Sequence, residues 1–176
     1  MPSLKQNELQ EIQTLYGYNI NEQFIETGSY MGTTIENIKN LFTKIYTIEL
    51  NQDLHNYCKK KFENDYNVNC LQGNSVDQLQ KILDINNNDT IFFLDGHYSG
   101  GETSRGDIDV PLLQELEVIN KYFKNNGIII IDDLRLFGKK CSEDWTQITK
   151  KNILHKLDNV KFSLTIDKFD KFIIYI

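Results

Sequence analysis

The chain has 176 residues, of which 40% are hydrophobic and 25% are charged, and its formal charge at pH 7 is −6. Length and composition predict one globular domain over residues 1–176. The negative charge, with no basic stripe along the sequence, argues against nucleic-acid binding, which needs clustered Lys and Arg. The longest strongly apolar run, residues 127–131, is too short to cross a bilayer, so we expect no membrane association.

Cysteine usage and the N-terminus bear on the compartment. Cys58, Cys70 and Cys141 form neither a CxxC pair nor an even disulfide framework. The first 19 residues lack the continuous apolar segment of a signal peptide. We therefore expect a cytoplasmic protein in a reducing environment.

Hydrophobic periodicity predicts alternating helices and strands. An amphipathic N-terminal helix is expected over residues 1–17. Strands are expected at residues 23–26, 44–50, 68–71, 90–94, 127–131, 160–166 and 171–176. Helices are expected at residues 33–42, 51–62, 75–83, 111–123 and 141–157, the last being mostly helical. This alternation predicts an α/β fold with a doubly wound, mostly parallel sheet and helices on both faces.

Polar residues collect at the carboxyl ends of the predicted strands, which is where open parallel sheets bind ligands. The turn after the first strand contains Gly28 and Gly32, which permit close backbone approach to a ligand, and the helix start at Thr33 offers unpaired amides. Glu49 ends the second strand, where an acid accepts hydrogen bonds from ribose hydroxyls. The plainer alternatives are a tight structural turn and a solvated carboxylate.

The segments FIETGSYMGTT, IYTIEL, LQGNS, FFLDGHYSGGET and IIIIDD, in this order, resemble a class I S-adenosylmethionine (SAM)-dependent methyltransferase. The resemblance runs from about residue 23 to residue 176. It implies a Rossmann-like sheet of seven strands with an antiparallel last strand. It also implies a SAM site in which the first turn binds methionine, Glu49 the ribose and the third strand end the adenine. The implied cofactor residues are Glu26, Thr27, Gly28, Ser29, Gly32, Thr33, Glu49, Asn74, Ser75 and Asp95.

Three carboxylates follow two neighbouring strands: Asp95 after the fourth, and Asp132 with Asp133 after the fifth. Three acids repel one another unless a cation joins them, and oxygen ligands suit Mg²⁺ or Mn²⁺. The alternative is that Asp132 caps the next helix while Asp133 is solvated. The arrangement resembles metal-dependent sugar O-methyltransferases, in which the residue at the position of His97 is the general base and Asp95 shares in catalysis.

The stretch from residue 98 to residue 109 is long and polar, which is typical of a substrate lid. Within it, Tyr98, Glu102 and Arg105 are candidate acceptor-binding residues, although Arg105 has acidic neighbours with which it could instead pair. Trp145, in a predicted helix, offers either a stacking face for a sugar ring or a core residue.

The sequence therefore favours a SAM-dependent O-methyltransferase that acts on a hydroxyl of a sugar or glycoconjugate with help from Mg²⁺ or Mn²⁺. The alternatives are a catechol-type or other small-molecule methyltransferase, and a binding module that keeps the cofactor fold without turnover. A nicotinamide-dependent dehydrogenase is disfavoured because the G-x-G-x-x-G fingerprint is incomplete. Since the chain is short for this fold, we expect a second copy of the chain, or a larger glycan-modifying protein, to complete the acceptor site.

Overall fold

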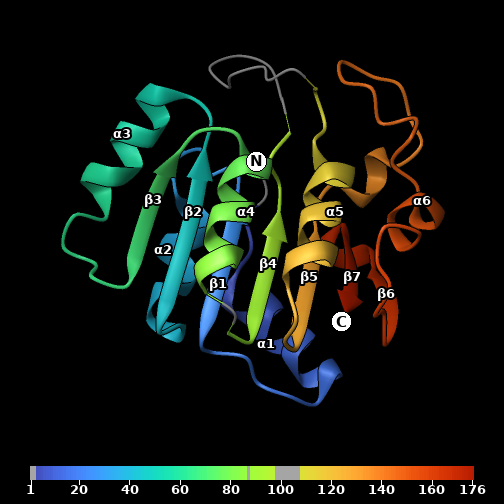
Figure 1. Ribbon diagram of the computed structural model, residues 1–176, viewed down its shortest axis with the longest axis horizontal. Helices are drawn as coiled ribbons and strands as arrows, with labels where there is room; N and C mark the ends of the chain where they lie inside the picture. The colour runs from blue at the N-terminus through green and yellow to red at the C-terminus, as the bar shows by residue number, and fades with distance from the viewer. Residues whose placement is uncertain (1–2, 87, 98–107) are drawn as a thin grey trace.

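The computed structural model describes residues 3–86, 88–97 and 108–176. Its centre is a sheet of seven strands in the order β3-β2-β1-β4-β5-β7-β6 (Figure 1). Strands β1 to β5 pair in parallel, and β7 runs antiparallel between β5 and β6. The strands are β1 (Gln23–Thr27), β2 (Lys44–Glu49), β3 (Val68–Gln72), β4 (Thr90–Leu94), β5 (Gly127–Ile131), β6 (Phe162–Ile166) and β7 (Lys171–Tyr175).

Helices cover both faces of the sheet, as the alternating sequence pattern predicts (Figure 1). The helices are α1 (Gln6–Tyr16), α2 (Thr33–Ile38), α3 (Gln52–Lys61), α4 (Ser75–Ile85), α5 (Leu112–Tyr122) and α6 (Lys150–Leu154), with short 3-10 turns at Lys39–Leu41, Leu134–Leu136 and Asp167–Phe169. No helix in the described ranges combines the length and the apolar character that a membrane span requires.

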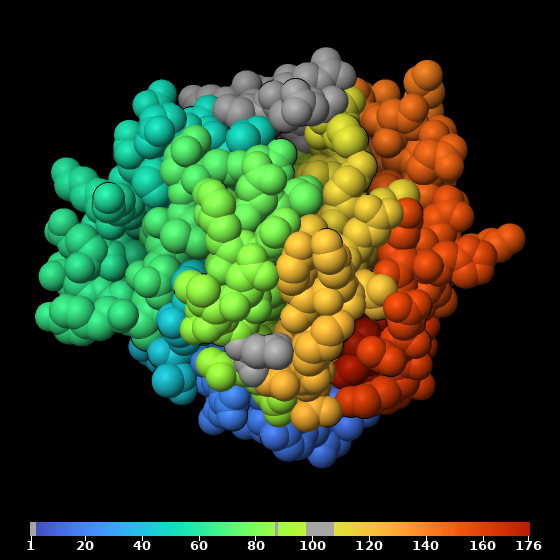
Figure 2. All heavy atoms as spheres, viewed as in Figure 1, coloured from blue at the N-terminus to red at the C-terminus, as the bar shows by residue number. Residues whose placement is uncertain are grey.

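Two hydrophobic layers sandwich the sheet, one on each face. One layer packs α4 and α5 against the strands, with Leu79 and Leu116 wholly buried. These two helices lie side by side over that face (Figure 2). The other layer packs α1 and α2 against the opposite face, with Ile12 and Ile35 wholly buried. Because β4 and β5 are covered on both sides, their sequences are continuous apolar runs.

The strand register aligns the ends that carry polar residues. Thr27 of β1 pairs with Ile48 of β2 and with Leu94 of β4, and Leu94 pairs in turn with Ile131 of β5. The residues that follow these positions therefore emerge along one edge of the sheet.

One predicted helix is wrong. Residues 141–157 were expected to be mostly helical, but only Lys150–Leu154 forms an α-helix. The segment before it folds back on itself, with the Trp145 amide donating to the Lys139 carbonyl at 3.0 Å and the Gly138 amide to the Ile148 carbonyl at 2.8 Å. Burial of Trp145 against the strand ends overrides its local helical pattern.

Candidate active site at the carboxyl ends of the strands

The turn after β1 is shaped by two glycines in the left-handed region. Gly28 has φ 83°, and a Cβ there would lie 2.5 Å from the carbonyl oxygen of Asp95. Gly32 has φ 67°, and a Cβ there would lie 2.7 Å from the Phe62 ring. Only glycine at position 28 allows this turn to lie so close to the end of β4, and a recess lies beside the turn, at the ends of the two strands.

Glu26 lies beneath this turn in a network of hydroxyl groups. Its carboxyl accepts a 2.5 Å hydrogen bond from Thr47, whose oxygen is also 2.5 Å from that of Ser29. Burial raises the pKa of Glu26 to about 8, although hydrogen bonds from Thr47 and Thr34 oppose that rise. A cationic ligand in the recess would lower this pKa and favour the charged form.

The recess itself brings together several residues that the sequence singled out. Its walls come from the end of β1, the start of α2 and the end of β4, and they include Glu26, Gly28, Ser29, Thr33 and Asp95. Thr27 lies outside these walls, because its hydroxyl faces α5 instead.

Glu49, at the end of β2, joins two loops. Its carboxylate oxygens accept hydrogen bonds from the backbone amides of Tyr30 and Asn51, each at 2.9 Å. Each oxygen keeps a further lone pair, so the side chain remains able to accept hydrogen bonds from a ligand's hydroxyls. The two backbone contacts hold the carboxylate beside the Gly28 turn.

Asn74 and Ser75 begin α4. Asn74 is its N-cap, with the side chain accepting a 2.9 Å hydrogen bond from the Val76 amide. The hydroxyl groups of Ser75 and Thr27 lie close enough to the carboxyl group of Glu115 on α5 to lower its pKa. The start of α4 and the end of β1 are thus both near a side chain from a third element.

That side chain, Glu115, was not singled out from the sequence. It is 1% exposed, and burial raises its pKa to about 7 even though the hydroxyls of Ser75 and Thr27 lower it. A Cβ at Gly96 would lie 3.1 Å from its Oε1 atom, so the turn after β4 also packs against it. The sequence could have indicated a buried acid here, because Glu115 lies three residues after Leu112, on the apolar stripe of the helix.

His97 lies between two acids at the ends of neighbouring strands. Its Nδ1 is 3.5 Å from Asp95 Oδ1, and its Nε2 is 3.3 Å from Asp133 Oδ2. Burial lowers the pKa of His97, although Asp133 and Glu143 raise it, so the neutral imidazole is favoured near pH 7. The ring of Trp145 lies edge-on to it, with centroids 5.1 Å apart.

Asp132 pairs with a lysine that the sequence interpretation overlooked. Its Oδ1 accepts hydrogen bonds from Lys171 Nζ at 3.0 Å and from the Asp133 amide at 2.9 Å. Burial raises the pKa of Asp132 in spite of that lysine. Its Oδ2 is buried and has no hydrogen-bond partner among the described residues.

The predicted metal ligands, Asp95, Asp132 and Asp133, therefore lie at one edge but divide into two overlapping groups. Within each group, one ligand atom per residue lies within 4.8 Å of the others: Asp95 with His97 and Asp133, and Asp132 with Asp133 and Asp170. Arg135 pairs with both Asp133 and Asp170. The pKa of Asp95 is raised well above its usual value by burial and by repulsion from Asp132 and Asp133.

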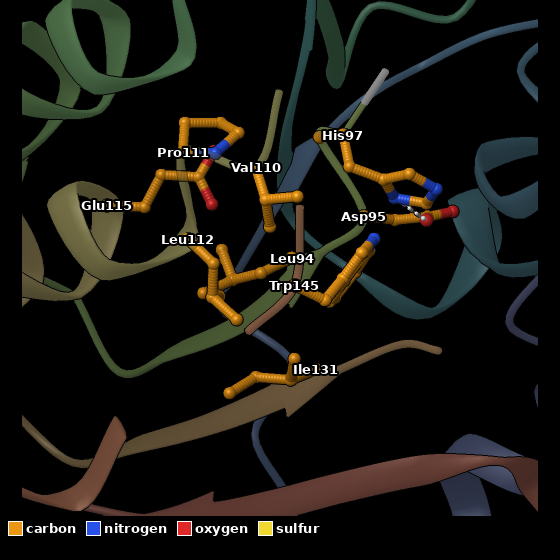
Figure 3. Close-up of a pocket in the computed structure, with 10 residues that line it drawn as sticks. Leu94, Asp95, His97, Val110, Pro111, Leu112, Glu115, Ile131 and Trp145 are labelled. Atoms are coloured by element: carbon orange, nitrogen blue, oxygen red, sulfur yellow. Dashed lines mark ion pairs between the residues drawn. The ribbon is translucent and has the colours of Figure 1, made fainter. Parts of the chain in front are cut away.

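Two further features lie beside His97. Glu143 accepts a 3.1 Å hydrogen bond from Trp145 Nε1 and lies close enough to His97 to raise its pKa. A small recess beside His97 has mostly apolar walls, formed by Leu94, Val110, Leu112, Ile131 and Trp145, with Glu115 across from Asp95 and His97 (Figure 3). The candidate acceptor residues Tyr98, Glu102 and Arg105 lie outside the described residues.

This chain resembles known proteins in its three-dimensional structure. No family model matches the sequence, and no curated protein matches it. An O-methyltransferase from Bacillus cereus in complex with SAH superposes with a TM-score of 0.67 at 15% identity, covering 99% of this chain and 82% of that one. An O-methyltransferase from Streptomyces achromogenes involved in tomaymycin synthesis, in complex with SAM, gives 0.69 at 13% identity, covering 99% and 81%.

A third similar structure is that of a fibrillarin. Fibrillarin from Aeropyrum pernix, with natively bound S-adenosyl-L-methionine, gives a TM-score of 0.59 at 13% identity, covering 94% of this chain and 73% of that one. The chain therefore has the Rossmann-like fold of class I SAM-dependent methyltransferases. At these identities the likeness concerns the fold, and function must be argued from the site.

Proposed function

We propose that this chain is a SAM-dependent O-methyltransferase whose acceptor is a hydroxyl group of a sugar or glycoconjugate. The observation that carries the proposal is the recess at the carboxyl ends of β1 and β4, which Gly28, Glu26, Ser29 and Thr33 line beside Glu49. Backbone atoms and acids around one opening suit a ligand that has a cationic centre and a ribose. When bound there, SAM supplies the methyl group.

The residues of the recess have distinct roles in this proposal. Glu49 accepts hydrogen bonds from the ribose hydroxyls through the lone pairs left by its two backbone contacts. Glu26 and Asp95 would offer negative charge to the cationic groups of the bound cofactor, and that positive charge would favour ionisation of both acids. Asn74 and Ser75, at the start of α4, would contact the adenine.

His97 is the proposed general base. Its neutral imidazole takes the proton of the acceptor hydroxyl, and Asp95 and Asp133 on its two sides stabilise the imidazolium that results. Burial of these groups keeps competing water away and strengthens their interaction. Alignment of the acceptor oxygen with the methyl group then supplies much of the rate enhancement.

The acidic cluster fits a divalent cation such as Mg²⁺ or Mn²⁺. Asp132 Oδ2 is buried without a hydrogen-bond partner among the described residues, and burial, together with repulsion from Asp132 and Asp133, raises the pKa of Asp95. The two overlapping groups, Asp95 with His97 and Asp133, and Asp132 with Asp133 and Asp170, each offer the oxygen ligands that such an ion prefers. When bound, the ion lowers the pKa of the acceptor hydroxyl.

A small aromatic acceptor, as in catechol-type methyltransferases, is the second candidate. The apolar walls of the recess beside His97 favour it, whereas the polar composition of residues 98–109 favours a sugar.

We also propose a cytoplasmic location, in keeping with the three unpaired cysteines. Completion of the acceptor site by a second copy of the chain, or by a larger glycan-modifying protein, is likewise a proposal.

Two experiments test the function. Calorimetry with SAM, SAH and NAD should show binding of the first two only, and failure of both to bind would overturn the proposal. Methyl transfer to a panel of monosaccharides, nucleotide sugars and catechols, with and without EDTA, then identifies the acceptor class and the need for metal. SAM binding without transfer to any acceptor would favour a non-catalytic binding module.

A further inference from the structure

Lys171 is a buried cation at the edge of the acidic cluster. It begins β7 and is 1% exposed, and in the part of the chain that the structure describes it is the only buried Lys or Arg. Its Nζ donates to Asp132 Oδ1 at 3.0 Å and to the Phe169 carbonyl at 3.3 Å, and it lies 5.5 Å from the centroid of the Phe93 ring. Such complete burial of a lysine requires a compensating charge, which Asp132 provides.

The other positive groups at the cluster are placed differently. Arg135 pairs with Asp133 and Asp170 from a half-exposed position, with 53% of its side chain exposed, so solvent screens its charge. His97 lies between Asp95 and Asp133 and is not paired with Asp132. Lys171 is therefore the cation whose charge acts on the cluster with the least screening.

The pairing is also one-sided. Lys171 and the Asp133 amide both bond to Oδ1 of Asp132, while Oδ2 is buried and has no hydrogen-bond partner among the described residues. A buried carboxylate oxygen without a partner needs an explanation, and an ion that binds there is one. Hydrogen bonding of one oxygen also fixes the orientation of the other, as outer-shell partners do for metal ligands.

We propose that Lys171 is a positioning residue with two effects: it stabilises the ion-free cluster by pairing with Asp132, and it weakens the binding of a divalent cation by repulsion. This inference rests on the metal site of the proposed function and adds a determinant of its affinity. An ion on Oδ2 of Asp132 would share that carboxylate with the ammonium group on Oδ1. Removing the positive charge should therefore strengthen ion binding, even though the ammonium group orients the ligand.

The test compares Mn²⁺ binding to the full chain, measured by electron paramagnetic resonance of free Mn²⁺ and by calorimetry. Lys171→Gln removes the charge and keeps a donor for Asp132. We expect this variant to bind Mn²⁺ roughly ten-fold more tightly than the unmodified protein, or more. The matched control is Lys156→Gln, which removes a lysine of an exposed pair with Glu117 and should leave Mn²⁺ affinity unchanged.

A thermal-stability measurement tests the inference even if a variant does not fold fully without the ion. Lys171→Met leaves Asp132 without its buried counter-ion, so its Tm should rise with Mn²⁺ by about 2–4 °C more than that of the unmodified chain. The double variant Lys171→Met with Asp132→Asn removes both charges and should lose this extra response.

Equal or weaker Mn²⁺ affinity in Lys171→Gln, including an absence of binding to either protein, would overturn the inference. Failure of the proposed function would be visible elsewhere, as an absence of SAM binding to the unmodified protein by calorimetry.

Discussion

Glu115 provides a test of how burial in this fold raises the pKa of a carboxyl group and so makes stability depend on pH. In the wholly buried carboxyl the pKa is raised from 4.5 to about 7, because desolvation outweighs the hydroxyls of Ser75 and Thr27. In the unfolded chain the group ionises around pH 4.5, while the folded protein keeps the proton up to about pH 7. Stability from this group is therefore fully present below pH 4.5 and is lost as the pH rises to 7.

The size of this effect follows from linkage. A pKa that rises from 4.5 to about 7 corresponds to about 3 kcal/mol of stability lost across that range. Glu115→Gln replaces the protonated acid with a neutral group of similar shape. The variant should exceed the unmodified protein by under ~1 kcal/mol at pH 5 and by about 3 kcal/mol at pH 8.

The assay is urea unfolding of both proteins at pH 5 and pH 8. Glu26, Asp95 and Asp132 are present in both proteins, so their contribution cancels in the difference. Glu117→Gln, on the same helix with 55% of its side chain exposed, is the control and should change stability by under ~1 kcal/mol at either pH. A difference between Glu115→Gln and the unmodified protein that stays constant with pH would refute the reasoning.

Three further substitutions test the proposed site. His97→Ala should lower turnover by roughly 10² and leave SAM affinity nearly intact, and an equal loss of both would argue against a base. Gly28→Ala should destabilise the fold by about 1–3 kcal/mol and weaken SAM binding, since a Cβ meets the Asp95 carbonyl at 2.5 Å; unchanged calorimetry would contradict this. Glu49→Gln should raise the Kd for SAM roughly ten-fold, and an unaltered Kd would remove its ribose role.

The local sequence pattern was sufficient for most of the fold. Continuous apolar runs such as Gly127–Ile131 predict strands buried on both faces, and the acids that end them predict a polar edge. The pattern failed at residues 141–157, where burial of Trp145 beside His97 outweighs helical propensity. Periodicity reports which face of an element is apolar, but it does not report what a loop packs against.

The order of elements and the positions of the acids at the strand ends follow from local spacing in the sequence. How those acids are neutralised depends on tertiary contacts. Lys171 lies 39 positions after Asp132, and it reaches that carboxylate because β7 is inserted antiparallel beside β5. Glu115 likewise meets Thr27 and Ser75 through the packing of α5. Such pairings depend on contacts between distant segments and on desolvation, which no local pattern records.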